Sequence, residues 1–163
     1  MRLIGGGLIA AAGLWCGLLA ARRLERELER CAMYIRMLEL LAWELERFKT
    51  PLPELFSTLA AALEGEPARL CQSLAHGLLS GEDAGSLWRE ALLAAAAQER
   101  EILLPLGSVL GRYGAPEQAA SVLAVKERME DLCRERRNGL RERRRVLIGI
   151  GTAGGIFLSV LLL

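Results

Sequence analysis

The chain has little of what most enzyme sites are built from. His76 is the single histidine among 163 residues, so a zinc site of the HExxH type or a Ser-His-Asp triad is hard to assemble. We expect His76 to be a surface or bundle residue, and the protein to be no enzyme, with no metal and no cofactor. Missing motifs argue only weakly against an unfamiliar catalytic site, which stays open.

Cysteine is also scarce. The four cysteines stand at positions 16, 31, 71 and 133 and form no CxxC pair, which argues against a zinc ribbon or a thioredoxin-like motif. We expect reduced thiols, because Cys16 falls in an apolar segment and the others in a cytoplasmic domain.

Strand patterns are missing too. The sequence has no alternating apolar and polar run of a half-buried strand, and β-branched residues are few beside leucine and alanine. This pattern predicts an all-α fold.

Both ends of the chain lack charge. Residues 3–21 and 146–163 carry no charged side chain, and the second stretch, at about 1.5 Å per residue, reaches roughly 27 Å as a helix. We predict a transmembrane helix in each. Gly149, Gly151 and Gly154 have the spacing of a dinucleotide-binding loop, but the nine residues that follow leave no room for the rest of that site.

The first apolar stretch has an alternative interpretation. Arg2 followed by small residues at Ala10 and Ala12 is compatible with a cleaved signal peptide. We favour a retained anchor, because the apolar run is longer than the usual core of a signal peptide, about 7–15 residues.

Arginines flank the apolar segments on their inner sides and predict the topology. Such flanks stay in the cytoplasm, so residues 22–145 should form a cytoplasmic domain, with both termini across the membrane. The topology determinants are Arg22, Arg23, Arg26, Arg141, Arg143, Arg144 and Arg145. Residues 134–145 hold seven arginines and no aromatic residue, which favours contact with lipid head groups over nucleic acid.

Glycines recur at a spacing of four in both apolar segments. Gly13 and Gly17 form one pair, and Gly151 and Gly155 the other. This spacing lets membrane helices approach closely, although glycine is also common in membrane helices for other reasons.

The central domain reads as a helical bundle. A first long helix ends near Lys49, where Thr50 is the expected N-cap of the next helix and Pro51 its first residue. Ser80 to Asp83 should break the helix that carries Leu70, Leu74 and Leu78. Pro105 should interrupt a later helix, and Gly107, Gly111 and Gly114 should mark close packing or turns. A final helix should start beyond Pro116 and run into the second apolar segment, antiparallel to the first helix.

The first helix carries apolar residues at alternating spacings of four and three, a heptad seam: Leu24, Leu28, Cys31, Ile35, Leu38, Ala42 and Leu45. The inward residues expected of the later helices are Leu52, Leu55, Phe56, Leu59 and Leu63, then Leu70, Leu74 and Leu78, then Leu87, Trp88, Leu92 and Leu93, and finally Val122, Val125, Met129 and Leu132.

Three stretches carry a resemblance to a known family: WELERFKTPLPELFSTLAAAL (43–63), SLWREAL (86–92) and LGSVLGRYGAPEQ (106–118). With an apolar segment at each end, the chain resembles the stage III sporulation protein AB family over its whole length. Relatives have an aspartate where this chain has Gly114, in a Gly-x-x-Asp-x-x-x-Gln pattern that ends here at Gln118.

The resemblance implies a function. The family belongs to a channel-like complex between mother cell and forespore, and its cytoplasmic domain is similar to the platform proteins of type II secretion and type IV pilus systems. We therefore expect a scaffold in the mother-cell membrane around the forespore. Its implied partners are the sporulation ATPase, stage III sporulation protein AA, and other membrane components of the complex.

For docking we predict the turn of Thr50, Pro51 and Leu52 and the segment 107–118, with Arg112 and Tyr113 exposed and Gln118 at its end. The same residues can instead serve as caps and packing positions. The main alternative function is a membrane-anchored sensor or regulator that forms a homo-oligomer through the seam from Leu24 to Leu45, since a heptad seam alone does not separate a bundle from a dimer.

Overall fold

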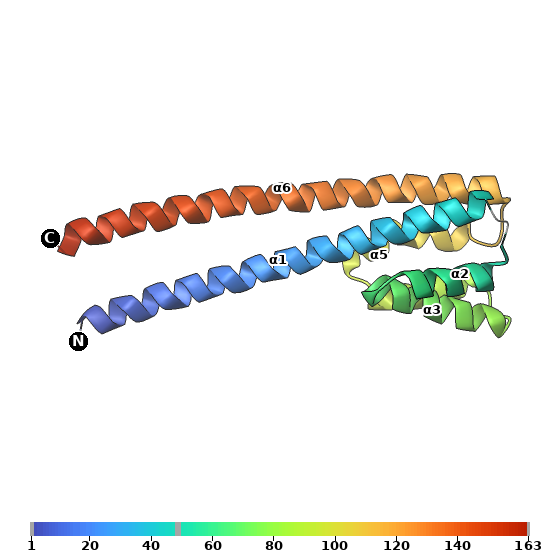
Figure 1. The fold of residues 1–163 in the computed structure, drawn as a ribbon, viewed down its shortest axis with the longest axis horizontal. Helices are drawn as coiled ribbons and strands as arrows, with labels where there is room; N and C mark the ends of the chain where they lie inside the picture. The colour runs from blue at the N-terminus through green and yellow to red at the C-terminus, as the bar shows by residue number, and fades with distance from the viewer. Residues whose placement is uncertain (1, 48–49, 163) are drawn as a thin grey trace. The chain divides into compact units, whose positions relative to one another are not determined.

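A computed structural model describes the backbone of residues 2–47 and 50–162, and the side chains of Arg22 and of residues 25–47 and 50–139. The described backbone is helical and contains no strand, which confirms the predicted all-α class. Residues 30–133 form one compact unit, and the two outer stretches of the chain group separately from it. The elements are α1 (Arg2–Arg47), α2 (Leu52–Ala62), α3 (Gly65–Leu79), α4 (Ala84–Ala91), the 3-10 turn η1 (Leu92–Ala94), α5 (Ala97–Leu103), the 3-10 turn η2 (Leu104–Ser108) and α6 (Ala115–Leu162) (Figure 1).

The predicted membrane segments remain predictions. Where the structure describes side chains, no helix is both long enough and apolar enough to cross a bilayer. Residues 3–21 and 146–163 lie outside that part of the chain. Outside it as well lie the paired glycines Gly13, Gly17, Gly151 and Gly155 and the arginines Arg23, Arg141, Arg143, Arg144 and Arg145, whereas Arg22 and Arg26 are exposed.

The long helices pair antiparallel in the compact unit, as predicted. The thiol of Cys31 on α1 donates to the carbonyl of Met129 on α6 at 3.6 Å. Further along, Lys126 Nζ lies 2.9 Å from Glu39 Oε1 and 3.3 Å from Glu130 Oε1. Hydrogen bonds to these two carboxylates, first to Glu39 and then to Glu130, raise the pKa of Lys126. Residues of increasing number on α1 thus contact residues of decreasing number on α6, so the two helices run antiparallel.

The buried face of α1 is wider than the predicted seam. Four seam positions are buried, but Leu28 and Ile35 are only half-buried. Tyr34, Met37 and Leu41 add a second row beside them. The reason is that α1 packs on two sides, against α6 through Cys31 and against α3, whose Leu70 lines a hollow together with Tyr34. A stripe of this width is typical of a globular bundle, whereas a two-stranded coil has a narrower one. The buried α1 residues are Cys31, Tyr34, Met37, Leu38, Leu41, Ala42 and Leu45.

Helix α2 begins one residue later than predicted. Pro51, not Thr50, is its N-cap, with extended backbone, and the Pro51 carbonyl accepts the first helical hydrogen bond from Leu55 N–H at 3.0 Å. Pro53 follows inside the first turn, where its missing N–H costs nothing because those donors have no partner within the helix.

Helix α3 ends at a glycine cap. Gly81 has φ +83°, a conformation that glycine adopts without strain. Its N–H donates to the Leu78 carbonyl, and Glu82 N–H donates to the Gly77 carbonyl. These two bonds make a Schellman motif, and they explain why the predicted break falls at residues 80–83.

Trp88 occupies the centre of the smaller helices. It is completely buried, its indole N–H donates to the Leu103 carbonyl at 2.9 Å, and its ring lies 6.3 Å from the ring of Phe56. Gly85 and Gly107 let α4 and η2 approach beside it, because a methyl group on Gly85 would lie 2.5 Å from the Gly107 carbonyl oxygen. One inward prediction was wrong: Leu93 points outward and is 69% exposed, because α4 gives way to η1 at Leu92.

This close approach gives a stability prediction. Gly85→Ala should lower the free energy of unfolding by about 1–3 kcal/mol, since a backbone atom cannot move aside easily. Gly139→Ala is the matched control: nothing lies within 4 Å of the added methyl, and alanine in a helix interior should stabilise by about 1 kcal/mol. Thermal melts followed by circular dichroism would measure both. Equal melting temperatures for the two variants would contradict the described contact.

Candidate docking site

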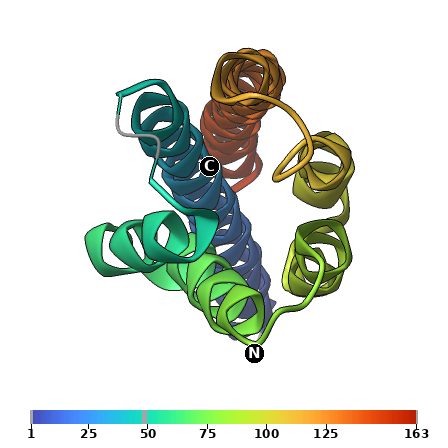
Figure 2. The same cartoon turned by 90° about the vertical axis from the view of Figure 1, so that its right-hand side faces the viewer.

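Three turns meet at one end of the compact unit. They are the start of α2, the α3–α4 turn and the loop between η2 and α6, and Figure 2 looks onto this end. A methyl group on Gly111 would lie 3.2 Å from Leu52 Cδ1 and 3.7 Å from the Cβ of Ala84. The structure thus brings together the two stretches predicted for docking and adds a third, the α3–α4 turn. We call these three turns the loop end.

Gln118 fixes the loop between η2 and α6. Its side chain is buried, with Oε1 accepting from Gly111 N–H at 3.3 Å and Nε2 donating to the Tyr113 carbonyl at 2.6 Å. Gly111 has φ +77°, which favours glycine there. Gln118 therefore braces the loop from inside.

Gly114 is the N-cap of α6. The helix begins at Ala115, and Gln118 N–H donates to the Gly114 carbonyl at 3.0 Å. Aspartate is among the best N-cap residues and glycine a weaker but acceptable one. The aspartate that the family resemblance leads us to expect at this position would thus also be an N-cap of α6.

One charged side chain, Arg112, and one aromatic side chain, Tyr113, project from this loop. Tyr113 is 60% exposed, and Arg112 lies 3.8 Å from Asp83 across the gap to the α3–α4 turn. The pKa of Asp83 is lowered, chiefly by the hydrogen bond from Ser86 N–H at 3.0 Å and further by Arg112. The predicted exposure of Arg112 and Tyr113 is confirmed.

A shallow hollow lies between the end of α1 and the start of α6. Its volume is about 250 Å³, and its lining includes Leu45, Pro116 and Leu123, the last of which is 44% exposed. In the turn of residues 50–52 predicted for docking, Pro51 is exposed, Thr50 is partly exposed, and Leu52 is half-buried against Gly111. The loop end therefore offers an aromatic residue and an arginine, two residue types that anchor protein interfaces, whereas the hollow is lined by α1 and α6 and not by the three turns.

Sequence reasoning did not find the part played by the α3–α4 turn. Ser80 to Asp83 were identified only as a helix break, although Asp83 is the N-cap of α4. An aspartate three residues before Ser86 is a capping signal, but nothing in the sequence pairs it with Arg112.

The remaining chemistry-bearing residues that the structure describes are three cysteines and a histidine. Cys31, Cys71 and Cys133 are buried, and burial raises the pKa of the Cys71 thiol to about 12. His76 lies on the surface of α3. Among the described residues, no three histidine, cysteine, aspartate or glutamate side chains are grouped so as to hold a metal ion.

Comparison with known proteins decides the family. The family described as Stage III sporulation protein AB matches residues 2–163. The chain belongs to this family. A solved structure titled "Stage III sporulation protein AB (SpoIIIAB)" is similar in fold, with a TM-score of 0.62 and 18% sequence identity, over 69% of this chain and 94% of the other. A search of curated proteins finds no match to the chain.

Membership in the stage III sporulation protein AB family makes the chain a sporulation protein. The residues that carried the resemblance have structural roles: Trp88 fills the core, and Gly111 and Gln118 hold the loop end. At 18% identity the solved structure supports the fold alone.

The two hydrogen bonds between Gln118 and the loop predict an effect on stability. Gln118→Ala should lower the free energy of unfolding by about 1–2 kcal/mol, because two hydrogen bonds to the loop are lost. Gln72→Ala, on the exposed face of α3, should change it by no more than about 0.5 kcal/mol. Chemical unfolding of the two variants would compare them. If Gln118→Ala matched the control, the side chain would not support the loop.

Proposed function

We propose that the protein is a non-enzymatic membrane scaffold of the endospore channel complex, which docks the sporulation ATPase, stage III sporulation protein AA, through the loop end. The observation that carries the proposal is the exposure of Arg112 and Tyr113 on a loop that Gln118 holds in place. A preorganised loop loses little conformational freedom on binding, which favours affinity.

The membrane part of the proposal rests on the sequence. The uncharged stretches 3–21 and 146–163, with arginines on their inner sides, support a two-pass protein in the mother-cell membrane with a cytoplasmic centre. The partners there are anionic lipid head groups and other membrane components of the complex. Gly13, Gly17, Gly151 and Gly155 are the proposed contacts between membrane helices.

The alternative of a dimer through the seam finds less support. From Cys31 onward, four of the seam positions are buried within a single chain, so a second copy cannot pack on them without opening the bundle. A homo-oligomer would have to use another surface.

A mechanical role follows from the long helices. Helix α1 runs unbroken over Arg2–Arg47, and α6 over Ala115–Leu162, so each connects the docking unit with an outer apolar stretch. A continuous helix transmits a push or a rotation better than a flexible linker does. We propose that the motion of a bound ATPase reaches the membrane by this route.

Docking through the loop end predicts a charge-sensitive interaction. The double variant Arg112→Glu/Tyr113→Ala should weaken binding of the full-length chain to the purified ATPase by at least about ten-fold, as for central anchor residues in other interfaces. A pull-down with ATP hydrolysis followed in the same tube would measure it. The control Arg128→Glu/Leu93→Ala reverses an exposed charge on α6 and trims an exposed apolar residue on η1, both outside the loop end.

The fold of both variants should match the wild type in circular dichroism. A smaller loss with the control than with the loop-end variant supports this docking face. ATPase binding that tolerates Arg112→Glu/Tyr113→Ala would contradict it.

Mechanical coupling predicts a separate failure. A flexible Gly-Ser insertion after Arg22 or after Arg145 should abolish spore formation while leaving membrane insertion and ATPase binding intact, because the helix no longer transmits force. Spore counts and membrane fractionation would test this in cells. Normal sporulation with either insertion would refute the coupling.

A further inference from the structure

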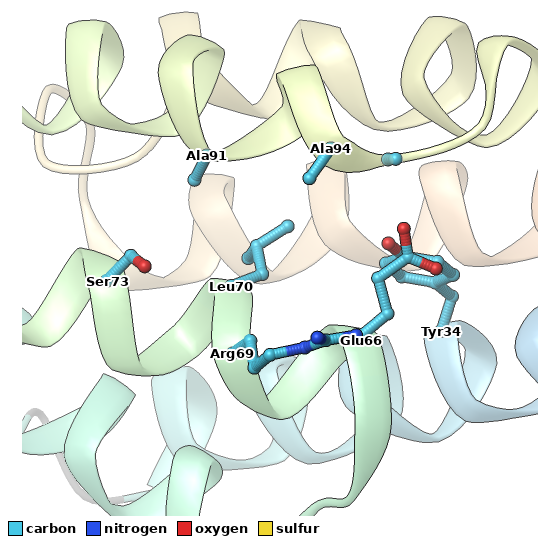
Figure 3. Close-up of a pocket in the computed structure, with 8 residues that line it drawn as sticks. Tyr34, Glu66, Arg69, Leu70, Ser73, Ala91 and Ala94 are labelled. Carbon is cyan, nitrogen blue, oxygen red and sulfur yellow. The ribbon is translucent and has the colours of Figure 1, made fainter.

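A groove runs between α3 on one side and α4 with η1 on the other, and we call it the α3–α4 groove. Two hollows form it, one of about 630 Å³ and one of about 230 Å³. They share Ser73, Ala91 and Ala94, so they are two parts of one depression. Figure 3 shows the smaller part, with Ala91 and Ala94 facing Leu70 and Ser73.

Small residues leave this groove open. Ala91 and Ala94 line it where larger side chains would narrow the gap between the helices, whereas the space over Gly77 is filled by the Leu87 side chain. Leu79 and Leu93, on the same two elements, are 75% and 69% exposed. The groove therefore combines room for side chains with apolar residues on the elements that form it, as in surfaces that accept a helix.

Tyr34 lines the narrow end of the groove. It is only 1% exposed, and its hydroxyl group has no hydrogen-bond partner in the structure. Burial and the nearby carboxylates Glu66 and Glu99 raise the pKa of the phenol, so it stays protonated. A buried hydroxyl without a partner is unusual, and Figure 3 shows the carboxylate of Glu66 beside the ring.

The charge along the groove is negative. Among the lining residues, Glu66, Glu82 and Glu90 contribute three carboxylates and Arg69 contributes one exposed guanidinium. Arg30 is a second cation at the narrow end, where it acts to lower the pKa of Tyr34 against the larger effects of burial and the carboxylates. His76 also lines the groove. A positively charged partner is therefore favoured over a negative one.

We propose that the α3–α4 groove binds a basic amphipathic helix of a partner protein, with one lysine or arginine side chain inserted at the narrow end. The cation donates a hydrogen bond to the Glu66 carboxylate and, once the side chains beside the phenol move apart, a second one to the Tyr34 hydroxyl oxygen, which is closed to solvent in the unbound protein. Small apolar residues of the partner helix face Ala91 and Ala94, and its other cations face Glu82 and Glu90. This proposal does not depend on ATPase docking at the loop end.

A pair of synthetic helices tests the charge preference. One fluorescein-labelled peptide of about 18 residues, or five helical turns, contains leucine, alanine and lysine, and its twin has glutamate in place of lysine. Binding to the purified full-length chain in detergent micelles is followed by fluorescence anisotropy. We expect the lysine peptide to bind at least about ten-fold more tightly than the glutamate peptide.

Variants then separate the groove from the micelle. Ala94→Trp fills the groove and should weaken binding of the lysine peptide about ten-fold, whereas Ala124→Trp, at an exposed alanine of α6, should not. Glu66→Gln should weaken binding about ten-fold, since it removes a hydrogen bond between charged groups, and the exposed Glu127→Gln on α6 should leave binding unchanged.

Tyr34→Phe provides the sharpest test. If the hydroxyl contacts a cation, its removal should weaken lysine-peptide binding about five-fold while the melting temperature stays the same or rises, because the unbound protein loses an unsatisfied group. A merely structural hydroxyl would not produce that combination. Equal binding of the two peptides, or wild-type binding by Tyr34→Phe, Glu66→Gln and Ala94→Trp, would overturn the proposal and leave the groove as a solvent-filled depression.

Discussion

The packing of Trp88 is the contact on which the smaller helices depend. Its ring is fully buried beside Phe56 of α2, and its N–H ties α4 to the carbonyl at the end of α5. The indole reaches that carbonyl because α4 and η2 approach at Gly85 and Gly107. Without this approach, α4 would separate from η2, and the loop after η2 would lose the support on which the position of Arg112 and Tyr113 depends.

The loop end also depends on a small number of residues. A glycine with positive φ turns the chain at position 111, and the buried Gln118 side chain accepts from the Gly111 N–H and donates to the Tyr113 carbonyl. The loop therefore presents an exposed arginine and tyrosine from a fixed backbone. A stiff loop between two helices suits a protein whose proposed role is to hold a partner in register with a membrane assembly.

Much of this fold could be predicted from the sequence, because helix periodicity and breakers are local signals. Five of the seven inward leucines expected at and after α2 and in α3 are buried, whereas Leu52 and Leu78 are half-buried. The effect of Pro105 and the antiparallel pairing of the long helices were predicted correctly. Three features were not predicted. The N-cap of α2 is Pro51 and not Thr50, and Leu93 lies on the surface where η1 follows α4. Tyr34 is buried beside the predicted seam because α1 has a second neighbour, and only this feature depends on a tertiary contact. The candidate site shows the same difference between local signals and tertiary contacts. The exposure of Arg112 and Tyr113 was predictable from a polar turn. The hydrogen bonds of Gln118 and the pairing of Arg112 with Asp83 depend on how the turns lie in space, which the sequence does not show.

The central claim is that the ATPase docks on the loop end. Hydrogen–deuterium exchange of the full-length chain, alone and with the purified ATPase, tests it without any substitution. Backbone amides lose exchange where a partner excludes water or suppresses local opening. The account predicts slower exchange on binding at residues 50–52, 80–83 and 109–114, with little change on the exposed face of α6. A complex that forms with no added protection in these three turns would contradict it.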